Sequence, residues 1–454
     1  MPRARGLDPV QAWLAAASVY RDRRLLALLF LGFSSGLPLA LTFSTLTVWL
    51  AESGVQKGTI GLFAALGTPY ALKFLWAPLM DRAPLPGLTR LLGRRRGWML
   101  GCQVALMAGI LALGAQDPIA NPGLTALLAL SVAFFSASQD IVIDAYRVEI
   151  LDERQYAAGA AAVVFGYRVA MLVSGAGALY LAALSDWFAA YGAMAGLMVV
   201  GMVTVLLSTE PQRQDSAETR QRQTEIEAFL AARGIGGDWR GRAAAWLYIA
   251  VVSPFLEFVS SRGWLVALVL GFVVFYKLGD SLAGVMTNPF LIELGFSKID
   301  IANVSKLYGF TATITGLALG GWLLGAAGMI RSLWICGILQ LASNLMFAVQ
   351  AEVGASLGFL ALTIGVENLA GGMGTAVFVA YLSSLCNVAY TATQYALLSS
   401  LFALPRTLIS AGSGYVAEAL AWTDFFIFTA VGAVPGLVIL WWLTRPGSAV
   451  RPAS

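Results

Sequence analysis

Long apolar runs alternate with short polar segments along most of this chain. Crossing roughly 30 Å of hydrocarbon as a helix takes about twenty apolar residues, and twelve of the runs are long enough. We place them at residues 25–50, 60–79, 98–115, 124–144, 157–184, 188–207, 264–294, 299–324, 333–349, 357–385, 391–421 and 425–443. The pattern predicts an all-α membrane protein of twelve transmembrane helices, arranged as six plus six.

Polar stretches divide this pattern into segments. We expect an N-terminal six-helix half at residues 1–208, a cytoplasmic linker at 209–262, a C-terminal six-helix half at 263–444 and a cytoplasmic tail at 445–454. Residues 243–259 are apolar but interrupted by Pro254, which favours a helix lying at the membrane interface over a thirteenth crossing. We expect no cleavable signal peptide, because the first apolar run is too long for one.

The basic residues indicate the orientation. Of the 29 Lys and Arg, 22 fall in loops on one side, whereas only Lys57 and Lys298 fall on the other. Loops rich in Lys and Arg stay in the cytoplasm. The distribution therefore predicts that both termini and the linker are cytoplasmic, in the inner membrane if the source is a bacterium.

Composition supports a protein that lies in lipid. Hydrophobic residues make up 58% of the chain and charged residues only 12%, whereas about a quarter of a soluble domain is charged. The net charge of +4 comes from loops, so we expect no nucleic-acid partner. Three scattered cysteines and no histidine suggest neither a disulfide framework nor a metal site, and no Walker pattern indicates use of ATP. We therefore expect a monomer without cofactors, powered by an ion gradient.

Short sequence segments of the first half recur in the second half. Residues 50–55 (LAESGV) recur as residues 291–296 (LIELGF) at an offset of 241. Ala145 and Tyr146 recur as Ala380 and Tyr381 at an offset of 235, and Arg168 as Arg406 at 238. Three similar offsets argue for a duplicated six-helix unit, which is common in secondary transporters.

Carboxylates inside the apolar runs are the candidates for proton coupling. A charge at the bilayer centre costs about 2.5–3.5 kcal/mol even on a lenient scale, so such residues usually have a role. Asp140 and Asp144 lie four residues apart on one helix face, and Asp280 and Glu367 fall in later spans. Asp140 is the first choice, because the nearest cation on its own helix, Arg147, is seven residues away.

Other polar groups on the spans could bind a substrate. A pocket for a molecule rich in hydroxyl, amide and carboxylate groups needs donors, acceptors, cations and aromatic faces. The candidates are Gln139, Tyr167, Arg168, Tyr276, Lys277, Asn368, Tyr381 and Arg406. The basic members could instead form ion pairs with the acidic residues, and Lys277 could simply pair with Asp280 three residues on.

A charged loop follows the second span. Asp81 and Arg82 end that span, and Arg94 and Arg95 precede the third, with an insertion at residues 83–92 between the two parts. This pattern resembles the signature loop of the major facilitator superfamily, and an acid–base cluster there could latch a gate. A plain positive anchor on the cytoplasmic side is the alternative.

Longer motifs resemble the AmpG-type muropeptide permeases of that superfamily. They are residues 32–41 (GFSSGLPLAL), 73–82 (KFLWAPLMDR), 135–142 (FSASQDIV), 276–280 (YKLGD) and 367–375 (ENLAGGMGT). The resemblance implies the major facilitator fold and proton-driven import of N-acetylglucosaminyl-1,6-anhydro-N-acetylmuramyl peptides for peptidoglycan recycling. It also implies a central role for the segment that contains Gln139 and Asp140. Some members have two further apolar segments after the twelve, which this chain does not show.

Two other functions compete with this interpretation. An importer of a different amphiphilic metabolite, such as a siderophore, could have the same twelve-helix fold. A membrane enzyme acting on a lipid-linked substrate would need at least two acidic ligands near the headgroups, whereas Asp140 and Asp144 lie within a span. The sequence therefore favours a transporter over an enzyme.

Overall fold

The computed structural model describes residues 22–152, 155–211, 265–385 and 407–445, with scattered positions between 224 and 248 and residue 403. Every regular element in these residues is a helix. Most of the expected linker helix at 243–259, about half of the eleventh span and Arg406 lie outside the described residues.

Ten helices of the described residues are long and apolar enough to cross a membrane. They are Arg23–Glu52, Arg94–Gly114, Pro122–Ile150, Ala158–Leu184, Trp187–Leu207, Val266–Glu293, Lys298–Ala327, Met329–Val353, Leu357–Leu382 and Trp422–Leu443. These confirm ten of the twelve predicted spans. About half of the eleventh span falls outside the described residues, and the second span is divided into short pieces.

The second predicted span does not form one continuous helix. It consists of α4 (Lys57–Leu62), η2 (Phe63–Gly67), α5 (Thr68–Leu72), η3 (Lys73–Leu75) and α6 (Ala77–Arg82). Pro69 and Pro78 stand in the first turns of α5 and α6, where the missing N–H does no harm, but they cannot continue a preceding helix. Short α7 (Leu88–Leu92) follows within the insertion.

The chain divides into two compact units by its internal contacts. Unit 1 comprises Met1–Val55, Thr68–Arg213 and Ser297–Lys306, and unit 2 comprises Gln56–Gly67, Gln214–Phe296 and Leu307–Ser454. The units follow the two sequence halves with one exception on each side. Residues 56–67 belong to unit 2, and residues 297–306 belong to unit 1.

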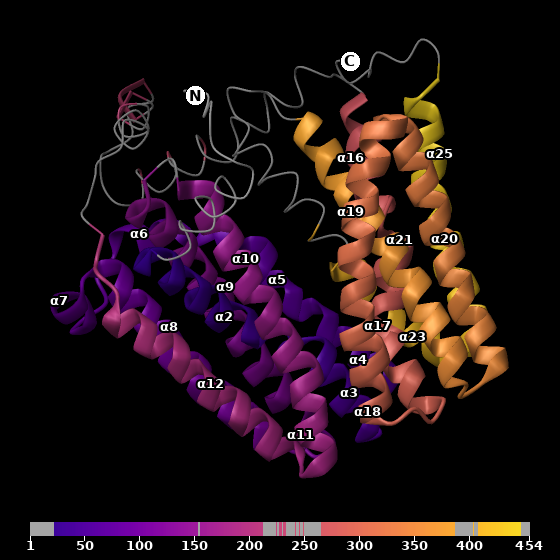
Figure 1. The fold of residues 1–454 in the computed structure, drawn as a ribbon, viewed down its shortest axis with the longest axis horizontal. Coiled ribbons are helices and arrows are strands. Elements are labelled where there is room, and N and C mark those ends of the chain that lie inside the picture. Colours follow the sequence, from indigo (N-terminus) through magenta and orange to yellow (C-terminus); the bar gives the residue numbers. More distant parts are fainter. Residues whose placement is uncertain are drawn as a thin grey trace, which may run out of the picture. The chain divides into compact units, whose positions relative to one another are not determined.

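Unit 1 is built around α2 (Arg23–Thr42), which packs on α10 (Tyr156–Leu172) and α9 (Pro122–Ile150). Glycine allows the closest of these approaches, since a Cβ on Gly36 would lie 2.9 Å from the Tyr167 Cα. On the other side, α8 (Arg94–Gly114) runs alongside α12 (Trp187–Leu207) (Figure 1). The remaining elements are α3 (Ser44–Glu52), η5 (Val173–Gly177), α11 (Ala178–Leu184), α18 (Lys298–Asp300) and η7 (Ile301–Tyr308).

Unit 2 contains α16 (Leu265–Phe275), α17 (Leu278–Glu293), α19 (Gly309–Ala327), α20 (Met329–Val353), α21 (Leu357–Ser384), α23 (Ser413–Ala419), α24 (Trp422–Gly432) and α25 (Val434–Leu443). The closest helix pair is α19 with α21 (Figure 1). Gly320 permits this contact, because a Cβ there would lie 2.8 Å from the Met373 Cα. Aromatic and aliphatic side chains of α16, α20, α21 and α25 form the core.

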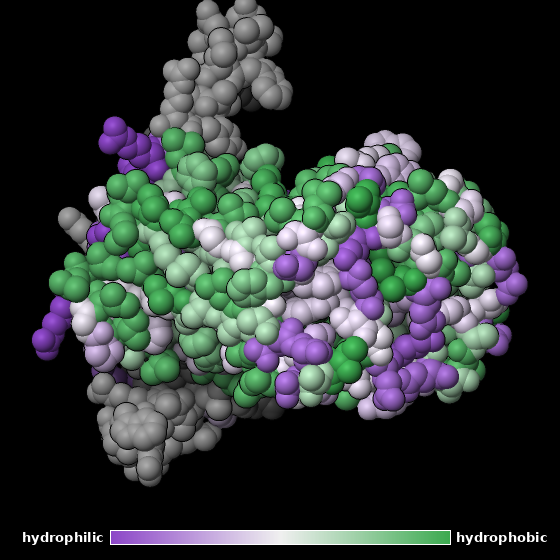
Figure 2. Space-filling model, turned by 90° about the horizontal axis from the view of Figure 1, so that it is seen from below, coloured by the Kyte–Doolittle hydropathy of each residue, from purple (hydrophilic) through white to green (hydrophobic). Residues whose placement is uncertain are grey.

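Large apolar side chains also point outward from both units. Leu127, Phe165 and Trp322 are 59%, 63% and 69% exposed. Figure 2 shows one face on which apolar residues cover wide areas between hydrophilic patches. Patches of this kind are costly in water but expected where lipid is the solvent.

Candidate functional site

Asp140 lies at the centre of a polar cluster in unit 1. Helix α9 places it opposite Ser35 of α2, whose hydroxyl donates a hydrogen bond to the carboxylate. The adjacent Gln139 is fully buried and donates to the Ser34 hydroxyl at 3.1 Å. Hydrogen bonds therefore join polar residues of α9 to the consecutive serines of α2, while the Gln139 side-chain oxygen stays buried without a partner among the described residues.

A cation from another element acts on Asp140. Lys73 of η3 lies close enough for its charge to influence the carboxylate, as does Asp144. Tyr70 and Tyr167 also lie within electrostatic reach of Asp140. The sequence offered no cation for Asp140 on its own helix, so the role of Lys73 was missed although the residue stands out within an apolar run.

Asp144 has a different environment from Asp140. Its side chain is 57% exposed and lies 3.5 Å from the Arg147 guanidinium, one turn along α9. The two aspartates share a helix face as predicted, but only Asp140 is enclosed by the bundle. An exposed carboxylate that is paired with a neighbouring cation is a poor candidate for the group that carries the coupled proton.

Lys277 occupies the break between α16 and α17 in unit 2. Its ammonium donates to the Thr375 hydroxyl at 2.8 Å and to the Gly371 carbonyl at 3.4 Å, both on α21. Asp280 stands in the first turn of α17. These contacts join the lysine at the helix break to α21.

Asn368 and Glu367 form a second polar group in unit 2. The Asn368 amide donates to Glu367 at 2.6 Å, and its oxygen accepts from the Thr313 hydroxyl of α19 at 2.8 Å. The two residues therefore help to join α21 to α19. A structural role therefore accounts for Asn368.

Tyr276 and Tyr381 do not line an accessible site. They are 3% and 6% exposed within the aromatic core of unit 2, where the Tyr276 ring stacks on Phe378 at 5.5 Å. The Tyr276 hydroxyl donates to the Leu333 carbonyl at 2.7 Å. This placement argues against the expected substrate contacts, because rings and hydroxyl are used in packing. Arg406, the remaining expected contact, lies outside the described residues.

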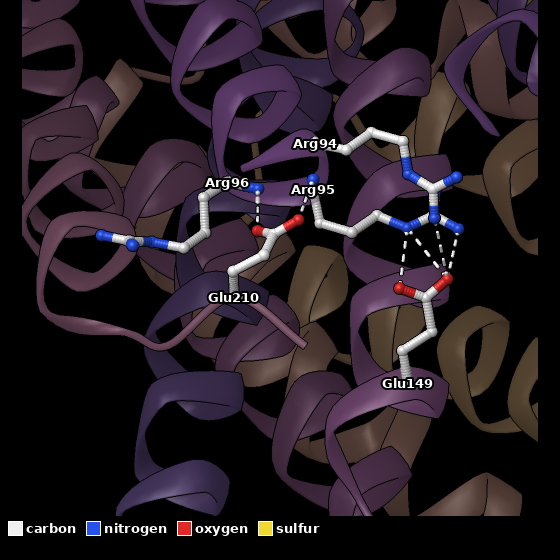
Figure 3. Close-up of polar contacts among 5 residues, drawn as sticks. All are labelled: Arg94, Arg95, Arg96, Glu149 and Glu210. Carbon is white, nitrogen blue, oxygen red and sulfur yellow. Dashed lines mark hydrogen bonds and ion pairs between the residues drawn. The ribbon is translucent and has the colours of Figure 1, made fainter. Parts of the chain in front are cut away.

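The arginines that precede the third span form an ion-pair cluster in unit 1 (Figure 3). Arg95 is 5% exposed and pairs with Glu149 at the end of α9, at 2.5 Å, and Arg94 lies 3.5 Å from the same carboxylate. Glu210 accepts hydrogen bonds from the backbone N–H groups of Arg95 and Arg96, at 2.8 and 3.0 Å. It thereby caps the start of α8 from a distant part of the chain.

This cluster changes the gating hypothesis. Asp81 and Arg82 end α6, but their side chains lie outside the described part of the structure. Arg94 and Arg95 pair instead with Glu149, which is not part of the loop motif. An acid at the end of the fourth span was visible in the sequence, but nothing local indicated its partner.

Removing Glu149 should destabilise unit 1. Glu149→Ala removes the carboxylate that pairs with the buried Arg95 guanidinium, so we expect a loss of about 1–3 kcal/mol in the free energy of unfolding. A thiol-reactive dye that reaches the buried Cys102 on unfolding reports the change as a lower melting temperature. Arg90→Ala, at an exposed position of α7, is the control and should stay within about 0.5 kcal/mol. An unchanged melting temperature for Glu149→Ala would contradict the assignment.

The described residues contain no group of three or more His, Cys, Asp or Glu side chains arranged to hold a metal. In unit 1 they place a carboxylate near a lysine, and in unit 2 they place a lysine that donates to Thr375 and Gly371. Such groups can exchange a proton and bind an anion.

Comparisons with known proteins agree with this picture. Residues 28–349 match the family model of the Major Facilitator Superfamily. The anhydromuropeptide permease of Escherichia coli K12 is 40% identical over 425 residues, covering 93% of this chain and 80% of the relative. The Rickettsia felis transporter named AmpG 4 is 35% identical over 94% of this chain and 98% of its own length.

Solved structures show the same fold at low sequence identity. A POT family transporter in complex with 5-aminolevulinic acid has a TM-score of 0.66 and 15% identity, covering 93% of this chain and 96% of that one. The nucleoside transporter NupG has a TM-score of 0.67 and 12% identity, with coverages of 93% and 100%.

Proposed function

Because this chain belongs to the major facilitator superfamily and, within it, to the AmpG-type permeases, we propose that it imports anhydromuropeptides by proton symport. The cargo is an N-acetylglucosaminyl-1,6-anhydro-N-acetylmuramyl peptide released during peptidoglycan turnover. The observation that carries the proposal is the 40% identity to an anhydromuropeptide permease over 93% of the chain. The chain is thus a multi-pass transporter and not an enzyme, and the inner membrane of a bacterium is the proposed location.

Asp140 and Lys73 carry the proposed coupling. While the Asp140 carboxylate is charged, the Lys73 ammonium serves as its counterion between the helices of unit 1. Protonation of Asp140 from the periplasmic side removes that partner. The Lys73 charge then becomes available to a carboxylate of the cargo, which links proton binding to cargo binding.

Lys277 in unit 2 is a further cation that we propose for the cargo carboxylates. Its ammonium also donates to the Thr375 hydroxyl and the Gly371 carbonyl. The stem peptide of the cargo supplies carboxylates, and its sugars supply hydroxyls and acetamides. Arg168 and Tyr167, beside the Asp140 cluster, are further donors in unit 1. No bound cofactor is needed, and we propose that the chain acts as a monomer in the lipid bilayer.

Uptake by membrane vesicles tests the cargo. Right-side-out vesicles that contain the chain should take up labelled anhydromuropeptide, whereas vesicles without it should not. The Arg90→Ala variant should match the wild type, because this residue lies on the exposed surface of α7. Absence of uptake by a protein shown to be folded would refute the proposal.

We also propose that both termini of the chain lie in the cytoplasm. With cytoplasmic termini, a cysteine placed at Asn121, before α9, or at Glu352, near the end of α20, should react with an impermeant reagent added outside whole cells. A cysteine at Ser216 in the linker should react only after the membrane is opened. Labelling of the Ser216 position from outside would overturn the orientation.

A further inference from the structure

Two buried amide side chains of α20 lack hydrogen-bond partners. Gln340 and Asn344 stand one turn apart on the same face of this helix and are 2% and 1% exposed. Among the described residues, neither the nitrogen nor the oxygen of the Gln340 amide has a partner, and the Asn344 amide nitrogen has none. A buried polar group without a partner is costly, so folded proteins nearly always supply one, either from the chain or as ordered water.

The duplicated position in unit 1 is better satisfied. Gln340 follows Gln103 of α8 by 237 residues, which is within the range of offsets of the internal repeat. The Gln103 amide donates to the Ser34 hydroxyl at 3.4 Å, and the same hydroxyl accepts from Gln139 at 3.1 Å. In unit 2, the residue that follows Gln139 by 235 positions is Gly374, which has no side chain to offer. The two units therefore share a buried glutamine but not the partners around it.

Both amides of α20 face glycines of neighbouring helices in unit 2. A Cβ on Gly374 of α21 would collide with the Gln340 amide, and a Cβ on Gly279 of α17 would lie 3.1 Å from the Asn344 amide nitrogen. A glycine gives neither amide a side chain with which to form a hydrogen bond. On this side of α20, polar side chains therefore face the bare backbone of α17 and α21.

The backbone opposite Asn344 is the start of a helix. Gly279 and the adjacent Leu278 are buried in the first turn of α17, and the first N–H groups of a helix have no partner within it. Lys277 occupies the N-cap position but makes no capping hydrogen bond with its side chain, because its ammonium donates to Thr375 of α21. The N–H groups of this turn therefore need acceptors from outside the backbone of α17.

We propose that Gln340, Asn344 and the first turn of α17 enclose an internal water site of unit 2. A water molecule both donates and accepts, and a buried one makes about three hydrogen bonds. It can accept from the two amide nitrogens and from the helix start, and it can donate to the Gln340 oxygen. Side chains one turn apart on a helix are separated by about 5–6 Å at their Cβ atoms, a distance that one or two waters bridge.

Ions match this set of atoms less well than water does. A cation would meet the donor hydrogens of two amides and the positive charge of Lys277, two residues before Gly279, all of which repel it. An anion would be attracted to these donors and to the helix start, but it would leave the Gln340 oxygen without a donor. A ligand that donates and accepts at once satisfies all three amide atoms.

Radiolytic labelling of the purified full chain tests for this water. X-ray pulses convert water into hydroxyl radicals, which react before they diffuse far, so a buried side chain is oxidised where water is bound beside it. Cys336 stands one turn before Gln340 on α20, is fully buried and lies within electrostatic reach of Lys277. Cys102 of α8 is also a buried free cysteine and serves as the internal standard. We expect Cys336 to be oxidised at least about fivefold faster than Cys102.

Replacing both amides should remove the signal. Gln340→Met combined with Asn344→Leu keeps the approximate volume of the two side chains, but the water loses the groups that bind it. Oxidation of Cys336, measured by mass spectrometry, should fall at least about fivefold, to the level of Cys102. Equal oxidation of Cys336 in the wild type and in the double variant would overturn the proposal.

Gln350→Met is the matched control. Gln350 is a buried glutamine of the same helix, but its amide already donates to the Gly354 carbonyl at 2.8 Å and accepts from Thr363 at 3.3 Å. This variant should keep the wild-type oxidation of Cys336, and a loss as large as that of the double variant would contradict a site at the two amides.

The comparison of the two cysteines within the wild type requires no variant, so it remains decisive even if the double variant does not fold. Oxidation of Cys336 no faster than that of Cys102 would contradict the water site. The readout does not involve cargo, so a failure of anhydromuropeptide uptake would refute the proposed cargo and leave the water site standing.

Discussion

The Asp140→Asn variant should fold and bind cargo but fail to accumulate it. For a carrier that moves one proton with each cargo molecule, a gradient of one pH unit drives about tenfold accumulation, because one unit corresponds to 1.36 kcal/mol. The amide keeps the shape of the carboxylate and can still accept a hydrogen bond from Ser35. It cannot exchange a proton, so the inside-to-outside ratio should fall to about one while exchange of labelled for unlabelled cargo continues.

Asp144→Asn is the matched control for this variant. Asp144 lies one turn away on the same helix, but it is exposed and paired with Arg147. Its neutralisation should leave the accumulation ratio close to that of the wild type. Uncoupler-sensitive accumulation by Asp140→Asn would remove Asp140 from the coupling role, and loss of accumulation in Asp144→Asn alone would transfer that role to Asp144.

Removing the disaccharide from the cargo should weaken binding far more than shortening the stem peptide. Each net hydrogen bond contributes about 0.5–1.5 kcal/mol, and each buried polar group left without a partner costs about 1–3 kcal/mol. The two sugars carry many hydroxyl and acetamide groups, so their loss should lower affinity by at least about a hundredfold. Removal of one terminal amino acid should change affinity by less than about tenfold.

Competition against labelled anhydromuropeptide measures this difference. The anhydro-disaccharide should compete well, free stem peptide poorly and a ferric siderophore hardly at all. Strong competition by the siderophore, without any by the disaccharide, would favour the importer of a different metabolite. Equal competition by peptide and disaccharide would contradict the prediction, because the sugars would then contribute no more to affinity than the peptide.

The sequence predicted the helices whose formation depends on nearby residues in the chain. A run of about twenty apolar residues has few alternatives to a membrane helix, so ten spans are confirmed in the described residues. The second span was predicted as one helix, although Pro69 and Pro78 were visible within it. Hydropathy averages over such residues, whereas the backbone responds to each missing N–H.

Contacts between helices could not be predicted in the same way. The influence of Lys73 on Asp140 depends on how η3 sits beside α9, which no spacing along the chain defines. Tyr276 and Tyr381 illustrate the opposite error. Residue type made them attractive for sugar binding, but packing on Phe378 and Phe272 takes them into the core of unit 2.

The duplication was visible in the sequence, but its consequence was not. The repeated segments 50–55 and 291–296 contain Glu52 and Glu293. The tryptophans that donate to these carboxylates, Trp187 and Trp422, lie more than a hundred residues further along the chain. Assigning a residue to a unit requires the contacts themselves. The sequence indicated the two six-helix halves. The structure shows in addition that residues 56–67 belong to unit 2 and residues 297–306 to unit 1.

Transport by the purified chain in liposomes tests the central claim most directly. Labelled anhydromuropeptide should accumulate inside the liposomes when the outer buffer is more acidic than the lumen. The protein molecules whose periplasmic side faces outward carry out this uptake. Collapse of the gradient by an uncoupler should return the internal concentration to the external value. Accumulation that persists after the collapse, or that never exceeds the external concentration under a maintained gradient, would contradict proton-coupled import.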